Sequence, residues 1–176
     1  MNAHIIALEG IDQSGKQTQT RLLAKHLRRL HYKVGNVSFP IYNTPAGIQI
    51  RHFLNGTRHY PPEAVHMLYS LNRWENLQTI EKLTRENEYL IADRYTPSNL
   101  AYGIARGLDL QWLRTLDNGL PKAELVIVLD TPIPSSFARK ARGRDRHERD
   151  KQLLSRVRKN YKTLSRKLGW KVLDGF

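Results

Sequence analysis

The sequence predicts a single parallel α/β domain with helices on both faces of the sheet, a three-layer α/β/α arrangement. Short apolar runs suited to buried strands alternate with helical patterns along the whole chain. The 176 residues are enough for one domain with its own core, and no internal repeat or linker divides them. The runs predicted as strands are residues 4–9, 33–39, 88–92, 125–129 and 171–173.

The first predicted strand leads into a phosphate-binding loop. Gly10 and Gly15 lie five positions apart, Lys16 follows at once, and a helical pattern continues to about Leu30. Glycines allow consecutive backbone N–H groups to point at phosphate oxygens, and the helix offers its positive N-terminal end to the same anion. Lys16 adds a mobile charge for the β and γ phosphates. The order of strand, loop, lysine and helix favours a P-loop over a glycine-rich turn that binds nothing.

One position departs from the P-loop pattern. The pattern places a hydroxyl residue directly after the lysine as a ligand for Mg²⁺, but Gln17 stands there and Thr18 follows one residue late. An amide oxygen is a weaker and longer metal ligand than a hydroxyl, so we expect Mg²⁺ binding to be affected.

Helices are predicted for the segment after the second strand. A short helix covers residues 46–54, and a pair of prolines opens a long helix over residues 61–86. Tyr69 and Arg73 are four residues apart, so they share one face of the long helix. Its apolar stripe is predicted to comprise Leu68, Leu71, Ile80 and Leu83.

The third predicted strand ends in Asp93, Arg94 and Tyr95. In an open parallel sheet, ligands bind at the carboxyl ends of the strands. This position favours a functional role for Asp93 and Arg94 over a purely structural ion pair.

The second half of the chain continues the alternation. Residues 100–106 and 110–117 are predicted helices split by a glycine, and residues 125–129 form an uninterrupted aliphatic strand with both faces covered. A helix follows to about Arg139, and a long basic helix covers residues 150–168.

An arginine-rich run separates these last two helices. It contains Gly143 and almost no apolar residue, so it has little to bury and is predicted to be a flexible lid at about residues 140–149. A solvated charge run and a nucleic-acid contact are the alternatives.

The composition indicates a polyanionic partner. Lys and Arg number 29 against 16 Asp and Glu, which gives a net charge of +13. There is no cysteine, no apolar run long enough to cross a membrane and no basic-then-apolar start, so we expect a soluble, cytoplasmic protein without membrane contact. The seven histidines lack metal-ligand spacing, and no role is assigned to them.

Taken together, these motifs resemble the thymidylate kinase family of P-loop nucleoside monophosphate kinases. The likeness extends from residue 4 to about residue 173. It rests on Glu9 to Asp12 with Gly15-Lys16, Phe39-Pro40, Tyr42 with Thr44-Pro45, Ser70 to Trp74, Asp93-Arg94-Tyr95, Ser98-Asn99, Tyr102 and Gly119 to Lys122. The resemblance implies a five-stranded parallel sheet, a homodimer, and transfer of the γ-phosphoryl group of ATP to dTMP with Mg²⁺, with nucleic-acid binding unlikely.

The resemblance also implies roles at the acceptor. Tyr69 corresponds to the aromatic residue stacked on thymine, and Arg73 to the arginine that bonds a thymine carbonyl. Asn99 corresponds to the residue at the N3 edge, and Tyr102 to the aromatic residue beneath the sugar. The other residues it implies at the substrate are Asp12, Phe39, Pro40, Tyr42, Arg94 and Ser98.

At the phosphates, Arg94 resembles the arginine that holds the acceptor phosphate, and Asp93 the acid that orients it. Metal-binding candidates are Gln17, Asp93 and Asp12. Because the loop carries no arginine, the resemblance implies a catalytic arginine in the lid, with Arg142, Arg144 and Arg146 as candidates. ATP contacts are implied for Gly10, Ile11, Asp12, Gln13, Ser14, Gly15, Lys16, Gln17, Thr18 and, near the adenine, Arg139.

The chain stops at Phe176, where the family usually continues into a final helix, so this helix is expected to be absent and ATP binding looser. Two other functions remain open. One is a kinase of another pyrimidine nucleotide such as dUMP, and the other is a catalytically weakened P-loop protein that binds nucleic acid.

Overall fold

A computed structural model describes residues 3–139 and 145–175 of the protein. The strands are β1 (His4–Glu9), β2 (Val34–Ser38), β3 (Tyr89–Asp93), β4 (Leu125–Asp130) and β5 (Lys171–Asp174). The helices are α1 (Lys16–Arg29), α2 (Pro45–Leu54), α3 (Pro62–Trp74), α4 (Leu77–Glu86), α5 (Thr96–Ala105), α6 (Leu110–Leu116), α7 (Ile133–Arg139), α8 (Arg146–Arg149) and α9 (Lys151–Leu168).

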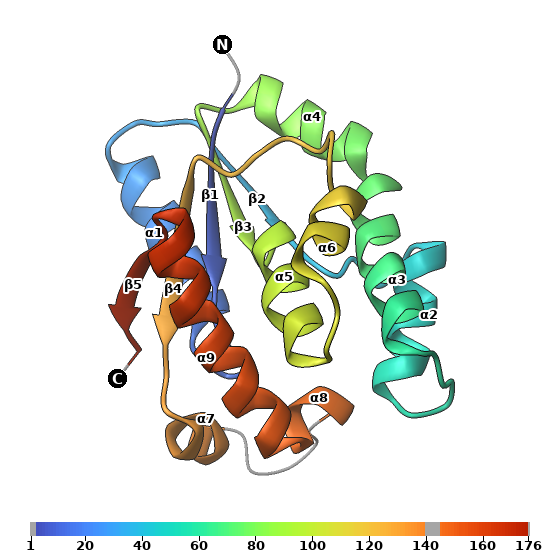
Figure 1. Ribbon diagram of the computed structural model, residues 1–176. Helices are drawn as coiled ribbons and strands as arrows, with labels where there is room; N and C mark the ends of the chain where they lie inside the picture. Colours follow the sequence, from blue (N-terminus) through green and yellow to red (C-terminus); the bar gives the residue numbers. More distant parts are fainter. Residues whose placement is uncertain (1–2, 140–144, 176) are drawn as a thin grey trace.

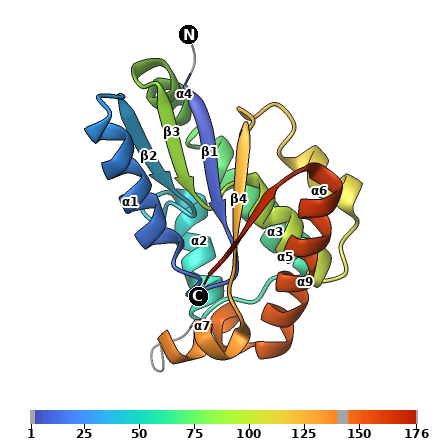
Figure 2. The same cartoon turned by 90° about the vertical axis from the view of Figure 1, so that its left-hand side faces the viewer.

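The strands form one five-stranded parallel sheet in the order β2-β3-β1-β4-β5 (Figure 1). Alternate residues of β1 enter different layers. Ile5 and Ala7 pack in the larger core with residues of α5 and α9, whereas Ile6 and Leu8 pack against α1. Figure 2 shows α1 on one side of the sheet and α5, α6 and α9 on the other. The predicted three-layer fold is therefore confirmed.

The predicted helix over residues 61–86 is wrong in one respect, because it is broken into α3 and α4. At the break, Asn76 leaves helical geometry (φ −104°, ψ 12°), and its side-chain amide donates to the Asn72 carbonyl at 2.7 Å. The Asn72 side chain itself bonds the backbone of Ile41 in the loop after β2, with contacts of 2.8 and 2.9 Å. Contacts with a distant loop thus end the first helix.

Two further expectations differ from the structure. Leu71 was expected in the apolar stripe, but its side chain is 51% exposed, while Ile80 is fully buried as expected. The helix expected to begin at residue 100 begins at Thr96, one turn earlier, with Pro97 in its first turn.

The carboxyl ends of β1 and β3 lie side by side. Leu8 of β1 is in register with Asp93 of β3, and the backbone N–H of Arg94 donates to the Leu8 carbonyl at 3.0 Å. Both strands point toward the end of the sheet where α7 and α8 lie (Figure 1). The loop after β1 and the segment after β3 therefore form one site.

Candidate active site

The loop between β1 and α1 has the curled backbone that a P-loop requires. Gly10 and Gly15 adopt positive φ angles of 139° and 93°. A Cβ on Gly10 would lie 2.7 Å from the Leu129 carbonyl oxygen, so no larger residue fits there. The glycines of the sequence motif are thus explained by backbone conformation and by close approach to β4.

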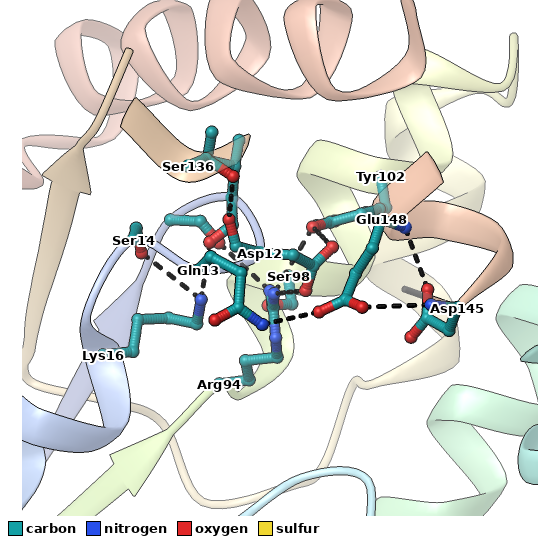
Figure 3. Close-up of polar contacts among 12 residues, drawn as sticks. Asp12, Gln13, Ser14, Lys16, Arg94, Ser98, Tyr102, Ser136, Asp145 and Glu148 are labelled. Atoms are coloured by element: carbon teal, nitrogen blue, oxygen red, sulfur yellow. Dashed lines mark hydrogen bonds and ion pairs between the residues drawn. The ribbon is translucent and has the colours of Figure 1, made fainter. Parts of the chain in front are cut away.

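Lys16 lies buried against this loop. Its Nζ donates to the Ile11 carbonyl at 2.7 Å and to Ser14 Oγ at 3.4 Å (Figure 3). Burial, together with the positive charge of Arg94, lowers the pKa of Lys16 to about 8. The lysine is therefore held against the loop by its own hydrogen bonds.

Arg94 connects the segment after β3 to the P-loop. Its backbone has a positive φ of 63°. The guanidinium donates to the Gly10 carbonyl at 3.1 Å and to Ser98 Oγ at 3.2 Å, and it forms an ion pair with Asp12 (Figure 3). The guanidinium also lies 3.4 Å from the Tyr102 hydroxyl. A left-handed conformation in a non-glycine residue whose side chain has four partners indicates a position that the surrounding structure fixes for function.

Asp12 is the acidic centre of this network. One carboxylate oxygen pairs with Arg94, and the other accepts a 2.9 Å hydrogen bond from the Tyr102 hydroxyl. Burial alone would raise the pKa of Asp12, but the charges of Arg94 and Lys16 lower it to about 2. Among the described residues, the carboxylate that pairs with Arg94 is therefore that of Asp12, and the orienting role that the resemblance implies for Asp93 stays a prediction.

Glu9 carried no predicted role beyond its place in the family motif. Its carboxylate bonds Ser98, whose hydroxyl contacts Arg94. Its fully buried carboxylate accepts from the Tyr95 backbone N–H at 2.7 Å, the Ser98 hydroxyl at 2.6 Å and the Tyr161 hydroxyl at 2.8 Å. These partners join β1 to the start of α5 and to α9. Burial raises the pKa of Glu9 despite these donors.

A cavity is lined by Arg94 and Asp12 together with residues from outside the P-loop. All of the residues expected to bind substrate line it, from several separate segments of the chain. They are Asp12, Phe39, Pro40, Tyr42, Tyr69, Arg73, Arg94, Ser98, Asn99 and Tyr102. The cavity is thus walled by aromatic rings, with polar groups at its ends, as a site for a base and a phosphate requires.

Arg73 is not a solvated arginine. It is buried, and its guanidinium donates to both carboxylate oxygens of Asp117 at 2.8–3.1 Å. The Ser70 hydroxyl donates to the same carboxylate at 2.8 Å. Asp117 went unnoticed in the sequence, because it lies 44 residues from Arg73 and follows no motif.

Two histidines line the cavity that sequence reasoning left without a role. His66 lies one helical turn before Tyr69, which could have indicated a shared face. His147 lies in the arginine-rich run, where the charge pattern predicted exposure, yet it is only 5% exposed and its ring stacks on Tyr102 at 5.7 Å. Burial, reinforced by the charge of Arg106, lowers the pKa of His147 to about 3.

Part of the predicted lid contacts the P-loop. Asp145 and Glu148 cap α8 reciprocally, and Gln13 Nε2 donates to Glu148 Oε1 at 2.6 Å (Figure 3). Arg146 lies over the Phe53 ring at 5.0 Å and 3.2 Å from His59 Nδ1, on the acceptor side. The other two candidate catalytic arginines, Arg142 and Arg144, lie outside the described residues.

Arg139, expected near the adenine, lies against the P-loop. Its guanidinium donates to the Gln13 carbonyl at 3.2 Å and to the Gly175 carbonyl at 2.6 Å. It therefore connects α7, the loop and the segment after β5.

The metal candidates occupy different surroundings. Gln17 and Thr18 are exposed in the first turn of α1, and Asp93 is half-buried at the end of β3. Both oxygens of Asp12 already accept from protein donors. In the described part of the chain, His, Cys, Asp and Glu side chains form no cluster of three or more that could hold a metal. Any metal would therefore be held by few protein ligands.

These features define a class of protein. A parallel sheet with a P-loop after its central strand, and an aromatic cavity lined by an arginine that bonds that loop, is the architecture of a P-loop nucleoside monophosphate kinase. No helix among residues 3–139 and 145–175 is both long and apolar enough to span a membrane.

Comparisons with known proteins identify the family. A family model described as thymidylate kinase matches residues 8–175. Thymidylate kinase of Schizosaccharomyces pombe is 35% identical, over 92% of this chain and 77% of the relative, and that of Homo sapiens is 31% identical, over 97% and 81%. The solved structure of thymidylate kinase from Candida albicans superimposes with a TM-score of 0.86 at 29% identity, covering 98% of this chain and 84% of that one. The chain belongs to the thymidylate kinase family.

Proposed function

We propose that the protein transfers the γ-phosphoryl group of ATP to dTMP, giving ADP and dTDP. The observation that carries the proposal is that Arg94 bonds the P-loop through the Gly10 carbonyl and also lines the aromatic cavity. An anion held by the P-loop and a second anion in the cavity would therefore approach each other at Arg94 with their phosphate ends. This is the in-line arrangement that phosphoryl transfer requires.

The P-loop amides and Lys16 would hold the β and γ phosphates of ATP. Arg94 would hold the acceptor phosphate, and a phosphate oxygen of dTMP would attack the γ-phosphorus as the bond to the β-phosphate oxygen breaks. Asp12 keeps the Arg94 guanidinium in place, and Glu9 fixes the hydroxyl of Ser98 beside it. The protein thus supplies alignment and positive charge, with no covalent intermediate.

Mg²⁺ would neutralise charge on the phosphates of ATP. Gln17 stands where P-loops carry the metal-binding hydroxyl. Its exposed amide oxygen could bind a metal, but only as a neutral ligand. Asp93 is half-buried at the end of β3, and its charge acts on Lys16 by raising the lysine's pKa, so it is an acidic residue that could bond the metal's water shell. We propose that these two residues hold the metal.

Tyr69, Arg73, Asn99 and Tyr102 would select the acceptor. Tyr69 offers an aromatic face for the base, and Arg73, fixed by Asp117, offers N–H donors to a carbonyl. The thymine methyl group contributes only about 0.8 kcal/mol on burial, roughly fourfold in rate, so dUMP should be a slower substrate.

The proposal is tested by measuring ADP formation from ATP and Mg²⁺ with and without dTMP. We expect ADP output to depend on dTMP and to fall in the order dTMP, dUMP, dCMP. Equal ADP output with and without dTMP would contradict the proposal.

We also propose that the protein is a homodimer. Met67, Leu71 and Trp74 lie on one face of α3 and are 36–51% exposed, and Ile48 of the neighbouring α2 is 44% exposed. Such an apolar stripe is suited to a second copy of the chain. The cytoplasmic location stays a prediction.

A further inference from the structure

A buried pair formed by His66 and Asn99 stands at the wall of the acceptor cavity. His66 belongs to α3 and Asn99 to α5, and their side chains are 0% and 2% exposed. His66 Nδ1 lies 2.7 Å from Asn99 Oδ1, and Asn99 Nδ2 donates to the His66 backbone carbonyl at 3.3 Å. The amide of Asn99 is therefore held at both of its ends by one residue.

This arrangement defines the state of the imidazole. An amide oxygen only accepts, so Nδ1 of His66 must carry the hydrogen at the 2.7 Å contact. Nε2 is then an acceptor, and it is buried without a partner among the described residues. Burial lowers the pKa of His66 to about 4, so the ring is neutral at pH 7 and carries one hydrogen, which the contact with Asn99 Oδ1 holds on Nδ1.

Whether the oxygen or the nitrogen of an amide faces N3 decides which pyrimidine the amide can bond. Thymine and uracil carry a hydrogen on N3, whereas cytosine has a lone pair there, so an amide oxygen suits the first two and an amide nitrogen suits the third. Turning the Asn99 amide by 180° would exchange these groups. It would also place Oδ1 against the His66 carbonyl, which is repulsive. Nδ1 could accept from the turned amide only if its hydrogen moved to Nε2, which is buried without a partner among the described residues.

We propose that His66 is a positioning residue that locks the Asn99 amide in one orientation and thereby makes the acceptor cavity select thymine or uracil over cytosine. The inference rests on the proposed function, because it places the N3 edge of the base at Asn99. His66 acts through Asn99 and does not itself touch the substrate.

The test compares kcat/KM for dTMP and dCMP in a single preparation of each variant. The ratio is independent of the fraction of active enzyme, so loss of folded protein does not imitate the effect. His66→Phe keeps an aromatic ring but removes the hydrogen bond, and we expect the dTMP to dCMP ratio to fall about tenfold. His66→Asn places an amide nitrogen near the position of Nδ1 and should keep the ratio within about twofold of the natural protein.

A double-mutant cycle separates action through Asn99 from direct contact. Asn99→Ala alone should lower the ratio, and adding His66→Phe should lower it no further. If His66→Phe does not fold, His66→Gln takes its place, because its longer side chain puts the amide near Nε2 and away from Asn99.

An unchanged ratio in His66→Phe would overturn the inference, as would a ratio in His66→Asn as low as in His66→Phe. A further loss when His66→Phe is added to Asn99→Ala would mean that His66 contacts the base directly, which also overturns it. Failure of the proposed function is distinct, because the natural protein would then phosphorylate neither nucleotide.

Discussion

The guanidinium of Arg73 is clamped by the carboxylate of Asp117, with Nη2 at 2.8 and 2.9 Å from its two oxygens, and the pair is more than 90% buried at the acceptor cavity. A buried arginine held in this way has little rotational freedom. Its remaining donors are therefore fixed in direction before the substrate binds.

Replacing Asp117 by Asn tests this clamp. The change keeps the shape of the side chain but leaves the Arg73 charge without its counterion, which should cost roughly 3 kcal/mol of unfolding free energy and raise KM for dTMP. Denaturant titration and steady-state kinetics measure the two effects. Glu81→Gln is the matched control, since its partner Arg85 is 64% exposed at 3.8 Å and loss of this pair should change stability by less than about 0.5 kcal/mol. Equal effects of the two substitutions would contradict a role for the clamp.

The pKa of Lys16, lowered to about 8 by burial, predicts a pH dependence of nucleotide binding. Below pH 8 the side chain is charged and attracts phosphate, and above pH 8 it becomes neutral in the free protein. The Kd of a non-hydrolysable ATP analogue should therefore rise roughly tenfold between pH 7 and pH 9. Titration calorimetry measures it, and Lys16→Met should bind weakly at every pH. A flat profile in the natural protein would mean that Lys16 stays charged throughout.

The residue at position 17 should set the Mg²⁺ concentration that the enzyme needs. If its amide is a weak ligand, Gln17→Thr should lower the Mg²⁺ concentration at half-maximal rate, because a hydroxyl then follows Lys16 as in the usual P-loop. Gln19→Thr makes the same change at another exposed glutamine of α1 and should leave the requirement unchanged. An unaltered Mg²⁺ dependence in Gln17→Thr would place the metal on other ligands.

The exposed stripe on α3 predicts an effect of charge on assembly. Leu71→Glu should convert a dimer to a monomer in analytical ultracentrifugation, because the side chain, 51% exposed, would carry a charge into the apolar contact. Leu30→Glu changes a leucine of similar exposure, 53%, at the end of α1 and should leave the mass unchanged. A monomeric natural protein would refute the dimer.

The strands and the P-loop could be predicted because their signals are local. Apolar runs of four or five residues mark β1, β3 and β4, and glycines with a following lysine mark the loop. The end of α3 could not be predicted from the sequence. Near this end the Asn72 side chain bonds the backbone of Ile41, which lies 31 residues away. Periodicity within a helix carries no information about such a partner.

In the candidate site, too, local motifs could be predicted and contacts between distant residues could not. The residues with predicted substrate roles line one cavity, whereas the roles of Asp117 and Glu9 depend on partners far away in the sequence. The burial of His147 could not be predicted, because the neighbouring charged residues indicated an exposed segment. The spacing of Asp145 and Glu148 is that of a capping box and could have indicated a short helix there.

The central claim is that Arg94 holds the acceptor phosphate beside the P-loop. Calorimetry with dTMP and with thymidine, which lacks the phosphate, measures this directly in the natural protein and in Arg94→Ala. The account predicts that the natural protein binds dTMP much more tightly than thymidine, and that Arg94→Ala loses most of this difference while its affinity for thymidine and for ATP is kept. An equal preference for dTMP over thymidine in both proteins would contradict it.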